Sequence, residues 1–393
     1  MRIGLGMALF TTAFVAFSQT SGYSAGNDGK SGIAWRSSAN HMCDERWAPS
    51  AITLSTGNQA LIAGGFSYSA GTCVATADIY DEATNAFTRV ASRMTYPRDF
   101  ATASMLPGGR VLIAGGYNLV LGSLFTLEIF DPTNRRFTLA QARLSEGREL
   151  FSATTLADGR ILFAGGFNTH THHTLDSADI YDPAAGTCTA VRGRMAQDRF
   201  GHAAQLLRDG RVLIVGGKHW RVGKPDRFLA SAEIYDPAAD RFFPAKNEMS
   251  TPRDRPTTSL LPDGRVLISG GQAGSKGPLA CDIFDPATET FTVAPAQMHD
   301  PRMAHGGAET PFGFVVAGGW DPVARKTTAS AETYDLLAGF WRTLPELPFD
   351  AHDLALVTFE DGGILAAGGK FSQPGKEGSR SEAAFFGKEH HAL

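Results

Sequence analysis

Charge of one sign is nowhere concentrated in this sequence. The 393 residues include 36 Lys and Arg and 40 Asp and Glu, for a formal net charge of −4, and like charges form no extended block. Binding to nucleic acid or to an anionic membrane surface requires a concentrated basic region. We therefore expect neither of these partners.

Long apolar runs are also scarce. One lies at the N-terminus, where Arg2 precedes an apolar stretch over residues 3–17 that is short for a bilayer and is followed by small and polar residues. This pattern predicts a signal peptide over residues 1–18, with a cleavage site between residue 18 and about residue 26. No later run is long enough to span a bilayer, so we expect an exported chain without a membrane span, either secreted or periplasmic.

Glycine, in contrast, is abundant, with 44 residues, and much of it comes in pairs. The stretch "RVLIAGGY" at residues 110–117 returns as "RILFAGGF", "RVLIVGGK" and "RVLISGGQ". Seven double glycines follow one another at intervals of 48 to 54 residues: Gly64-Gly65, Gly115-Gly116, Gly165-Gly166, Gly216-Gly217, Gly270-Gly271, Gly318-Gly319 and Gly368-Gly369. A period near fifty with short apolar strands predicts a kelch-type propeller rather than a helical solenoid.

The rest of the unit repeats with the glycines and supplies four strands. An Ala-, Thr- and Ser-rich strand and an Asp-Gly turn precede the apolar run, while an acid-led strand such as "ADIYD" and an aromatic-led strand such as "FTRV" follow it. Short strands separated by turn residues indicate antiparallel hairpins. We expect an all-β fold of seven blades, with the small-residue strands next to the axis and the apolar runs buried between blades.

The two ends of the chain predict how the ring closes. The last unit stops after its third strand, near "SEAAFF", while the N-terminal segment "AWRSSANHM" has Trp35 and Met42 seven residues apart, as Phe87 and Met94 are in the first unit. We expect the segment around Trp35 to be the outermost strand of the seventh blade, because closure removes exposed sheet edges. The propeller would then occupy residues 30–393.

The apolar run with its glycine pair, the spaced aromatics and the period resemble the kelch repeat family, and "LLPDGRVLISGG" resembles the propeller of galactose-oxidase-like proteins. The resemblance covers almost everything from Trp35 onward. It implies the fold strongly and the activity weakly, because propellers carry binding, scaffolding and several enzymatic functions.

A likeness to galactose oxidase would imply copper bound by two tyrosines and two histidines, with one tyrosine cross-linked to a cysteine. His202 and His305 stand where such histidines could stand, in "RFGHAA" and "RMAHGG", but Gly201 and Ala304 occupy the tyrosine position. Arg255 stands where the cross-linked tyrosine would be. Without these phenols, the radical chemistry is not implied.

An arginine recurs just before the first strand of six units, whereas the seventh unit has Ala351. The six are Arg46, Arg98, Arg148, Arg199, Arg253 and Arg302. Around the axial opening they would form a cationic funnel for an acidic sugar, a carboxylate or an acidic peptide. The alternative, which the matching register favours, is internal pairing with the acids that begin the third strands: Asp78, Glu128, Asp179, Glu233, Asp282, Glu332 and Glu382.

Histidines offer two further candidate sites. The sets are His170, His172 and His173 in the loop "THTHH", and His202, His305 and His352 near the axis. Imidazoles at these spacings could share Zn²⁺ or Cu²⁺. Solvated loop residues and hydrogen-bonding channel residues are the alternatives that the sequence favours, so we expect no metal and no cofactor, with copper or zinc as the alternative.

The loop "GGKHWRVGKPDRF" after Gly217 carries Trp220 among several cations. An exposed Trp in this setting is a candidate surface for stacking a sugar ring or binding an anion. Trp47, Phe167 and Trp320 occupy comparable loop positions. The alternative is a Trp folded back onto the propeller.

Of the four cysteines, Cys43 and Cys73 are expected in loops of the first blade that open on the same face. In an oxidising compartment they could form a disulfide that stabilises by about 3–4 kcal/mol in the chain-entropy model. Cys188 and Cys281 are expected as buried thiols.

The sequence shows no nucleophile–base pair and no phosphate-binding loop, since no helix pattern follows the double glycines. It favours a binding module for a protein or glycan ligand. The binding surface would be the face that carries the loops after the double glycines, called the top face below. The alternative is an enzyme, either a galactose-oxidase-like oxidoreductase or a sugar isomerase.

Overall fold

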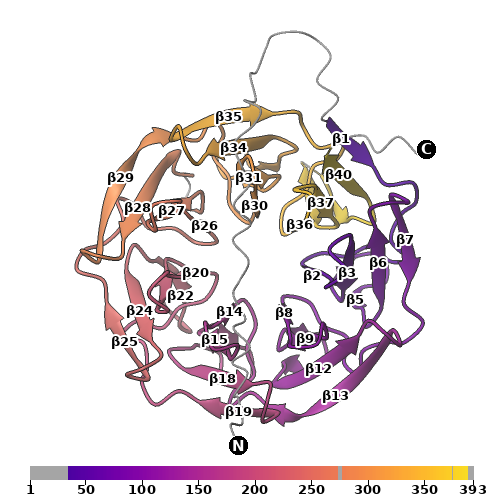
Figure 1. Ribbon diagram of the computed structural model, residues 1–393, viewed down its shortest axis with the longest axis horizontal. Coiled ribbons are helices and arrows are strands. Elements are labelled where there is room, and N and C mark those ends of the chain that lie inside the picture. Colours follow the sequence, from indigo (N-terminus) through magenta and orange to yellow (C-terminus); the bar gives the residue numbers. More distant parts are fainter. Residues whose placement is uncertain (1–33, 273–276, 374, 388–393) are drawn as a thin grey trace, which may run out of the picture. The chain divides into compact units, whose positions relative to one another are not determined.

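Seven antiparallel sheets of four strands each surround one axis (Figure 1). The computed structural model describes residues 34–272, 277–373 and 375–387. The predicted signal peptide and the first residues of the predicted propeller domain lie outside this range. All regular elements of the described residues are strands, which confirms the predicted all-β propeller of seven blades.

Each blade runs from the axis outward. The innermost strands are β2 (Ser50–Thr53), β8 (Thr102–Met105), β14 (Ser152–Thr155), β20 (Ala203–Leu206), β26 (Thr257–Leu260), β30 (Gly306–Thr310) and β36 (Ala355–Thr358). The second strands are β3 (Gln59–Ala63), β9 (Val111–Ala114), β15 (Ile161–Ala164), β21 (Val212–Val215), β27 (Val266–Ser269), β31 (Gly313–Ala317) and β37 (Ile364–Ala367). The innermost strands need small residues because they converge: a Cβ added at Gly306 would lie 2.7 Å from the Cβ of Leu356 in the next blade.

The outer half of each blade follows the double glycine. The third strands are β6 (Ala77–Asp81), β12 (Thr126–Asp131), β18 (Ala178–Asp182), β24 (Ala232–Asp236), β28 (Ala280–Asp285), β34 (Ala331–Asp335) and β40 (Ala383–Gly387). The outermost strands are β7 (Ala86–Arg89), β13 (Arg136–Arg143), β19 (Thr187–Ala190), β25 (Arg241–Pro244), β29 (Thr290–Gln297), β35 (Phe340–Leu344) and β1 (Ala34–Ser37). Apolar side chains of the second and third strands form the core between neighbouring blades.

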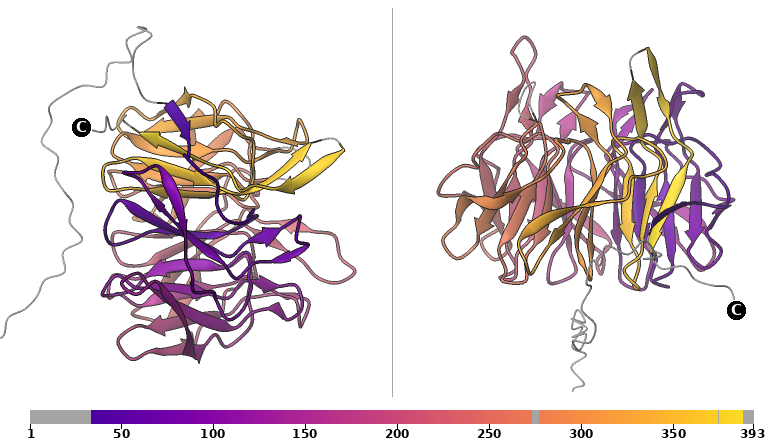
Figure 2. Two further views of the ribbon diagram at one scale, coloured as in Figure 1. Left: turned by 90° about the vertical axis from the view of Figure 1, so that its right-hand side faces the viewer. Right: turned by 90° about the horizontal axis from the view of Figure 1, so that it is seen from above.

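Short hairpins stand between the second and third strands of six blades in the described residues. They are β4 (Phe66–Ser67) with β5 (Thr72–Cys73), β10 (Tyr117–Asn118) with β11 (Gly122–Ser123), β16 (Phe167–Asn168) with β17 (His173–Thr174), β22 (Lys218–His219) with β23 (Arg227–Phe228), β32 (Trp320–Asp321) with β33 (Lys326–Thr327), and β38 (Lys370–Gln373) with β39 (Lys376–Ser379). Figure 2 shows β22–β23 and β38–β39 projecting from the same face. The hairpins therefore build the top face. Across the described ranges, no helix is long and apolar enough to cross a membrane.

The ring is closed by the N-terminal strand, as predicted. Strand β1 pairs antiparallel with β40, with Trp35 opposite Phe386 and their rings 5.0 Å apart. The seventh sheet therefore has the order β1-β40-β37-β36 and joins the two ends of the described chain.

The double glycines join each blade to the next. The N–H of the second glycine donates to a carbonyl of the following blade at 2.7–2.9 Å, in the pairs Gly65–Arg98, Gly116–Arg148, Gly166–Arg199, Gly217–Arg253, Gly271–Arg302, Gly319–Ala351 and Gly369–Arg46. The first glycine has positive φ, and at Gly368 an added Cβ would lie 2.6 Å from the Arg46 carbonyl oxygen. Glycine is required here because any side chain would separate the two blades.

Candidate functional site

The six repeated arginines are buried inside the blades. Their side chains have 0 % exposure, and each guanidinium lies 2.7–3.2 Å from the carboxylate near the start of the third strand. The pairs are Arg46–Asp78, Arg98–Glu128, Arg148–Asp179, Arg199–Glu233, Arg253–Asp282 and Arg302–Glu332. These six arginines do not form the cationic funnel that was one interpretation of the sequence, because their charges are neutralised by carboxylates inside the blades. The alternative interpretation, internal pairing with the acids of the third strands, is the one the structure has.

The pairs are supported by further hydrogen bonds, as a buried ion pair needs. In the second blade, Arg98 also donates to the carbonyl of Gly115 at 2.8 Å, and Glu128 accepts the N–H groups of Thr95 and Tyr96 at 2.7 and 3.1 Å. In this blade the guanidinium and the carboxylate are therefore satisfied by protein groups, whereas Nε of Arg46, Arg148, Arg199 and Arg302 has no partner among the described residues.

The seventh blade has no such pair. Ala351 stands at the arginine position, and the ladder between β37 and β40 places Ala384, opposite Ala366, at the acid position. The sequence-based prediction that Glu382 occupies the acid position is therefore wrong, because that position lies two residues later, at Ala384.

An apolar cluster occupies the space instead. Phe349 is buried together with Ala351 and Ala384. Arg380 supplies a guanidinium from another position and contacts both Asp350 and Glu382. The seventh blade thus keeps the strand register while its polar groups are rearranged.

A ring of backbone in left-handed conformation surrounds the axial opening on the top face. It consists of the residues two positions after each arginine or Ala351, with φ between 47° and 62°: Ala48, Phe100, Leu150, Gly201, Arg255, Ala304 and Asp353. Neighbours in the ring are hydrogen-bonded, for example Arg255 N–H to the Gly201 carbonyl at 2.7 Å and Asp353 N–H to the Ala304 carbonyl at 2.7 Å. We call these seven residues the axial mouth.

An ion pair lies at this mouth. The Arg255 guanidinium contacts both carboxylate oxygens of Asp353, at 2.7 and 2.8 Å, and lies 5.5 Å from the Phe100 ring centroid. Asp353 also accepts from Trp47 Nε1 at 3.0 Å and from His352 Nδ1 at 2.9 Å. Burial alone would raise the pKa of Asp353, but Arg255 and His352 hold it below its usual range.

A cavity of about 290 Å³ is lined by the mouth together with His202 and His305. His202 Nε2 lies 2.9 Å from Ser152 Oγ, and His305 Nε2 lies 2.8 Å from Thr257 Oγ1. Burial, reinforced by the nearby arginine of each blade, lowers the pKa of both imidazoles to about 3. Both histidines are therefore neutral at physiological pH.

Several buried polar atoms around the mouth have no hydrogen-bond partner among the described residues. They are Asp99 Oδ1, Thr102 Oγ1, His202 Nδ1, Asp254 Oδ1 and His305 Nδ1. Buried polar atoms are usually paired, so a group of unpaired ones marks a place where another molecule can supply the partners. Asp254 Oδ1 projects over Gly201, where it would lie 2.5 Å from an added Cβ.

Three acids stand one residue before the mouth positions: Asp99, Glu149 and Asp254. Burial raises the pKa of Asp99 to about 7 and that of Glu149 to about 8, and the charge of a neighbouring Asp adds to each shift. Burial also raises the pKa of Asp254. No role was predicted for these acids, although an Asp or Glu directly follows three of the six arginines in the sequence.

Aromatic rings flank the mouth on one side. Trp47 makes edge contacts with Phe100 and His352, with ring centroids 5.3 and 6.5 Å apart, and Trp320 lies 6.1 Å from His352. Lys370 Nζ lies 5.2 Å from the Trp47 ring centroid. The side chains of three residues therefore lie together beside the axial mouth: Trp47, Trp320 and His352. This placement is compatible with a shared surface on the top face.

Trp220 lies elsewhere on the top face. It is half-buried and packs edge-on against Phe167 at 5.4 Å, and its backbone bonds to Thr174 of the neighbouring blade. This arrangement is closer to a Trp folded onto the propeller than to an open stacking surface.

The loop histidines do not converge. His170 Nε2 lies 3.1 Å from the carbonyl of Ser123, while His173 is part of strand β17. Among the described residues, no group of three or more His, Cys, Asp or Glu side chains is arranged to hold a metal ion. His170, His172 and His173 are therefore not assembled into a metal site in this structure.

The predicted Cys43–Cys73 disulfide is absent, since all four cysteines are free thiols. Cys43 Sγ lies 3.0 Å from Asp78 Oδ2, beside the first arginine pair, while Cys73 is buried in strand β5. Burial raises the pKa of both thiols to about 12. The two loops open on the same face, but their cysteines face different neighbours.

No protein-family profile matches the chain, and no curated protein sequence matches it. Among solved structures, the chain is similar to one described as a novel fungal alcohol oxidase of the AA5 family in complex with copper. The similarity has a TM-score of 0.68 and 17 % identity over 91 % of this chain and 76 % of that one. It shows a galactose-oxidase-like propeller fold, and at this identity it shows the fold alone.

The residues of this chain do not fit a copper centre of the galactose-oxidase kind. Gly201 and Ala304 have no donor side chain, Arg255 is a cation paired with Asp353, and the two histidines use Nε2 in hydrogen bonds to hydroxyl groups.

Proposed function

We propose that this chain is an exported propeller whose axial mouth binds a glycan. The observation that carries the proposal is a cavity of about 290 Å³ whose lining includes Thr102, His202 and His305, each of which has a buried polar atom without a partner among the described residues. Sugar hydroxyl groups donate and accept at once, so a sugar ring can satisfy carboxylate oxygens and imidazole nitrogens together.

The surroundings of the cavity support the same ligand class. Trp47, Phe100 and Trp320 offer ring faces and edges beside polar groups, which is the combination that sugar rings use. The Arg255–Asp353 pair adds a donor fork and acceptor oxygens in a fixed orientation. The ring of backbone hydrogen bonds holds these side chains rigidly.

An oxidoreductase is the second candidate, favoured by the fold likeness to a copper alcohol oxidase. It ranks lower because the tyrosine positions carry Gly201, Ala304 and Arg255. A sugar isomerase has no specific observation in its favour. Export to the periplasm or outside the cell remains part of the proposal, on the strength of the N-terminal sequence.

A glycan array probed with the purified protein tests the proposal. We expect saturable binding of one glycan class, weakened about tenfold by Thr102→Val and by Phe100→Ala, because each removes one contact in the cavity. Val222→Ala is the matched control, since Val222 is exposed on the β22–β23 hairpin, away from the mouth, and the change should leave binding unchanged. If the chain bound a protein but no glycan, the proposed ligand class would be wrong. If both variants bound glycan as tightly as the wild type, the axial mouth would not be the binding site.

A further inference from the structure

The seventh blade has two carboxylates for one guanidinium near the place where the other six blades have their buried ion pair. In those six blades, one buried guanidinium pairs with one carboxylate that is at most 4 % exposed, and Arg46 and Arg302 also lie 3.9 and 3.7 Å from the more exposed Asp44 and Asp300. In the seventh blade, Arg380 alone faces both Asp350 and Glu382. One carboxylate there lacks a cation of its own.

The carboxylate with the weaker partners is Glu382. Asp350 is saturated, because it accepts from Arg380, from Gln373 at 3.1 Å and from Thr327, and its pKa lies below the usual range. Glu382 accepts from Arg380 Nη1 and from the Ser381 N–H, each at 3.1 Å, and its side chain is 36 % exposed. Arg380 is thus held mainly by Asp350.

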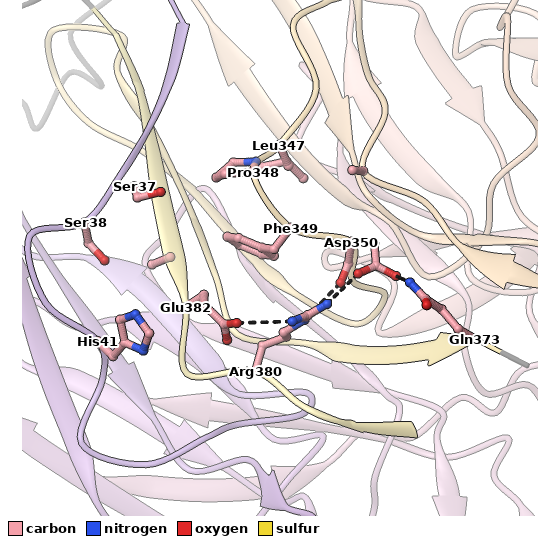
Figure 3. Close-up of a pocket in the computed structure, with 12 residues that line it drawn as sticks. Ser37, Ser38, His41, Leu347, Pro348, Phe349, Asp350, Gln373, Arg380 and Glu382 are labelled. Carbon is pink, nitrogen blue, oxygen red and sulfur yellow. Dashed lines mark hydrogen bonds and ion pairs between the residues drawn. The ribbon is translucent and has the colours of Figure 1, made fainter. Parts of the chain in front are cut away.

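Glu382 opens on a cavity of about 420 Å³, drawn in Figure 3. One wall is apolar and consists of Leu347, Pro348 and Phe349. The other wall carries the polar side chains of Ser37, Ser38 and His41, which come from the N-terminal segment that closes the ring. The cavity falls in the size range of sites for small molecules.

The cavity arises from the break in the repeat. In the second blade, the two residues after Leu or Met donate N–H groups to the acid, as Thr95 and Tyr96 do to Glu128. The corresponding residues of the seventh blade are Pro348, which has no N–H group, and Phe349. One of the two backbone donors found in the second blade is therefore missing here.

We propose that this cavity is a second binding site, for an organic monocation with a short aliphatic stem, namely an alkylguanidinium or alkylammonium group. The cationic head pairs with Glu382, and the stem packs on Leu347, Pro348 and Phe349. The walls carry Asp350 and Glu382 against Arg380, so a single positive charge completes the balance. A metal ion is not indicated, because no cluster of three ligand side chains occurs in the described parts of the chain.

Calorimetric titration of the full chain with n-butylguanidinium chloride tests this site. We expect one saturable site with a Kd of about 1 mM, given the size of the probe. The neutral isostere n-butylurea should not bind, since it has the same shape without the charge. Equal binding of n-butylurea would show an apolar void, and the absence of saturable binding of n-butylguanidinium would overturn the proposal.

Two variants locate the site. Glu382→Gln keeps the shape and removes the charge, and should weaken n-butylguanidinium binding at least about tenfold. Ala329→Leu fills the apolar side of the cavity and should weaken it without touching a charge. Glu346→Gln is the control, because Glu346 is exposed and does not line the cavity, so its affinity should match the wild type. Unchanged affinity in both cavity variants would contradict the assignment.

A further arm distinguishes two sources of the same chemistry. Tighter binding of Nα-acetyl-arginine N-methylamide than of n-butylguanidinium would assign the site to an arginine side chain of a protein. The reverse order would assign it to a free small cation. The site is independent of the axial mouth, so its failure would leave the proposed glycan binding untouched.

Discussion

The first six blades and the seventh solve the same packing problem with different chemistry. In each of the six, a guanidinium and a carboxylate are buried together, whereas the seventh buries Ala351, Ala384 and Phe349 at the corresponding place. The strand register is nevertheless the same, because Ala384 stands opposite the second strand of its blade at the position that Asp179 has in the third blade. The buried pair is therefore not what defines a blade; the ladder and the glycine joint are.

The largest effect is expected from breaking one pair on one side only. Arg148→Ala leaves the Asp179 carboxylate buried without its cation, which should lower the free energy of unfolding by about 3–5 kcal/mol. Urea denaturation followed by circular dichroism measures the loss.

Copying the seventh blade should reverse most of that loss. Arg148→Ala combined with Asp179→Ala and Glu146→Phe introduces the residues that stand at Ala351, Ala384 and Phe349. Replacing a buried ion pair with packed apolar side chains is often neutral. A triple variant that is less stable than Arg148→Ala alone would contradict the equivalence of the two arrangements.

The seventh blade differs also in taking its outermost strand from the other end of the chain. Trp35→Ala should cost about 3 kcal/mol, because Trp35 is buried against Phe386 and holds that strand in place. Thr88→Ala, on the exposed side of the outermost strand of the first blade, is the control and should have little effect. Thermal unfolding compares the two, and equal melting temperatures would speak against closure by β1.

The double glycine that joins each blade to the next should tolerate no side chain in any blade, including the blade that closes the ring. Gly368→Ala places a Cβ against the Arg46 carbonyl, whereas Gly71→Ala, also at positive φ, meets no atom within 4 Å. The control should cost about 1 kcal/mol for its conformation alone. Gly368→Ala should cost about 2 kcal/mol more because of the contact, which equilibrium unfolding would resolve.

The smallest effect concerns the acids of the mouth, which have no buried arginine as partner. Asp99 and Glu149 have pKa values raised to about 7 and about 8, so the folded protein binds more protons than the unfolded chain between about pH 4 and pH 8. Their stabilising contribution is complete below about pH 4 and is lost as the pH rises through this window. In the wild type the melting temperature should fall as the pH rises, and Glu149→Gln should reduce this fall by a few degrees. An unchanged dependence of the melting temperature on pH would contradict the raised pKa of Glu149.

Much of the fold could be predicted from the sequence because its signals are local and repeated. The double glycines give the number of blades, and the spacing of Trp35 and Met42 gives the closing strand. The acid position of the seventh blade was missed for a physical reason. Side chains alternate with a period of two, so a shift from Ala384 to Glu382 keeps the same face and no pattern distinguishes them.

The site was less predictable because it depends on distant residues meeting. Arg255 and Asp353 are 98 positions apart, and only ring closure brings them together. The local sequence likewise did not determine whether the repeated arginine side chains point to solvent or into the blade, since a basic side chain near a loop can do either. The acids after three of the arginines acquire their raised pKa values mainly through burial, which the local sequence does not reveal.

Hydrogen–deuterium exchange with a glycan from the array tests the central claim most directly. If the top face is the functional one, bound glycan should slow exchange in residues 47–50, 99–102, 254–257 and 352–355. The turns at the opposite ends of the blades, such as residues 107–110 and 157–160, should be unchanged. Protection confined to those turns would contradict the account.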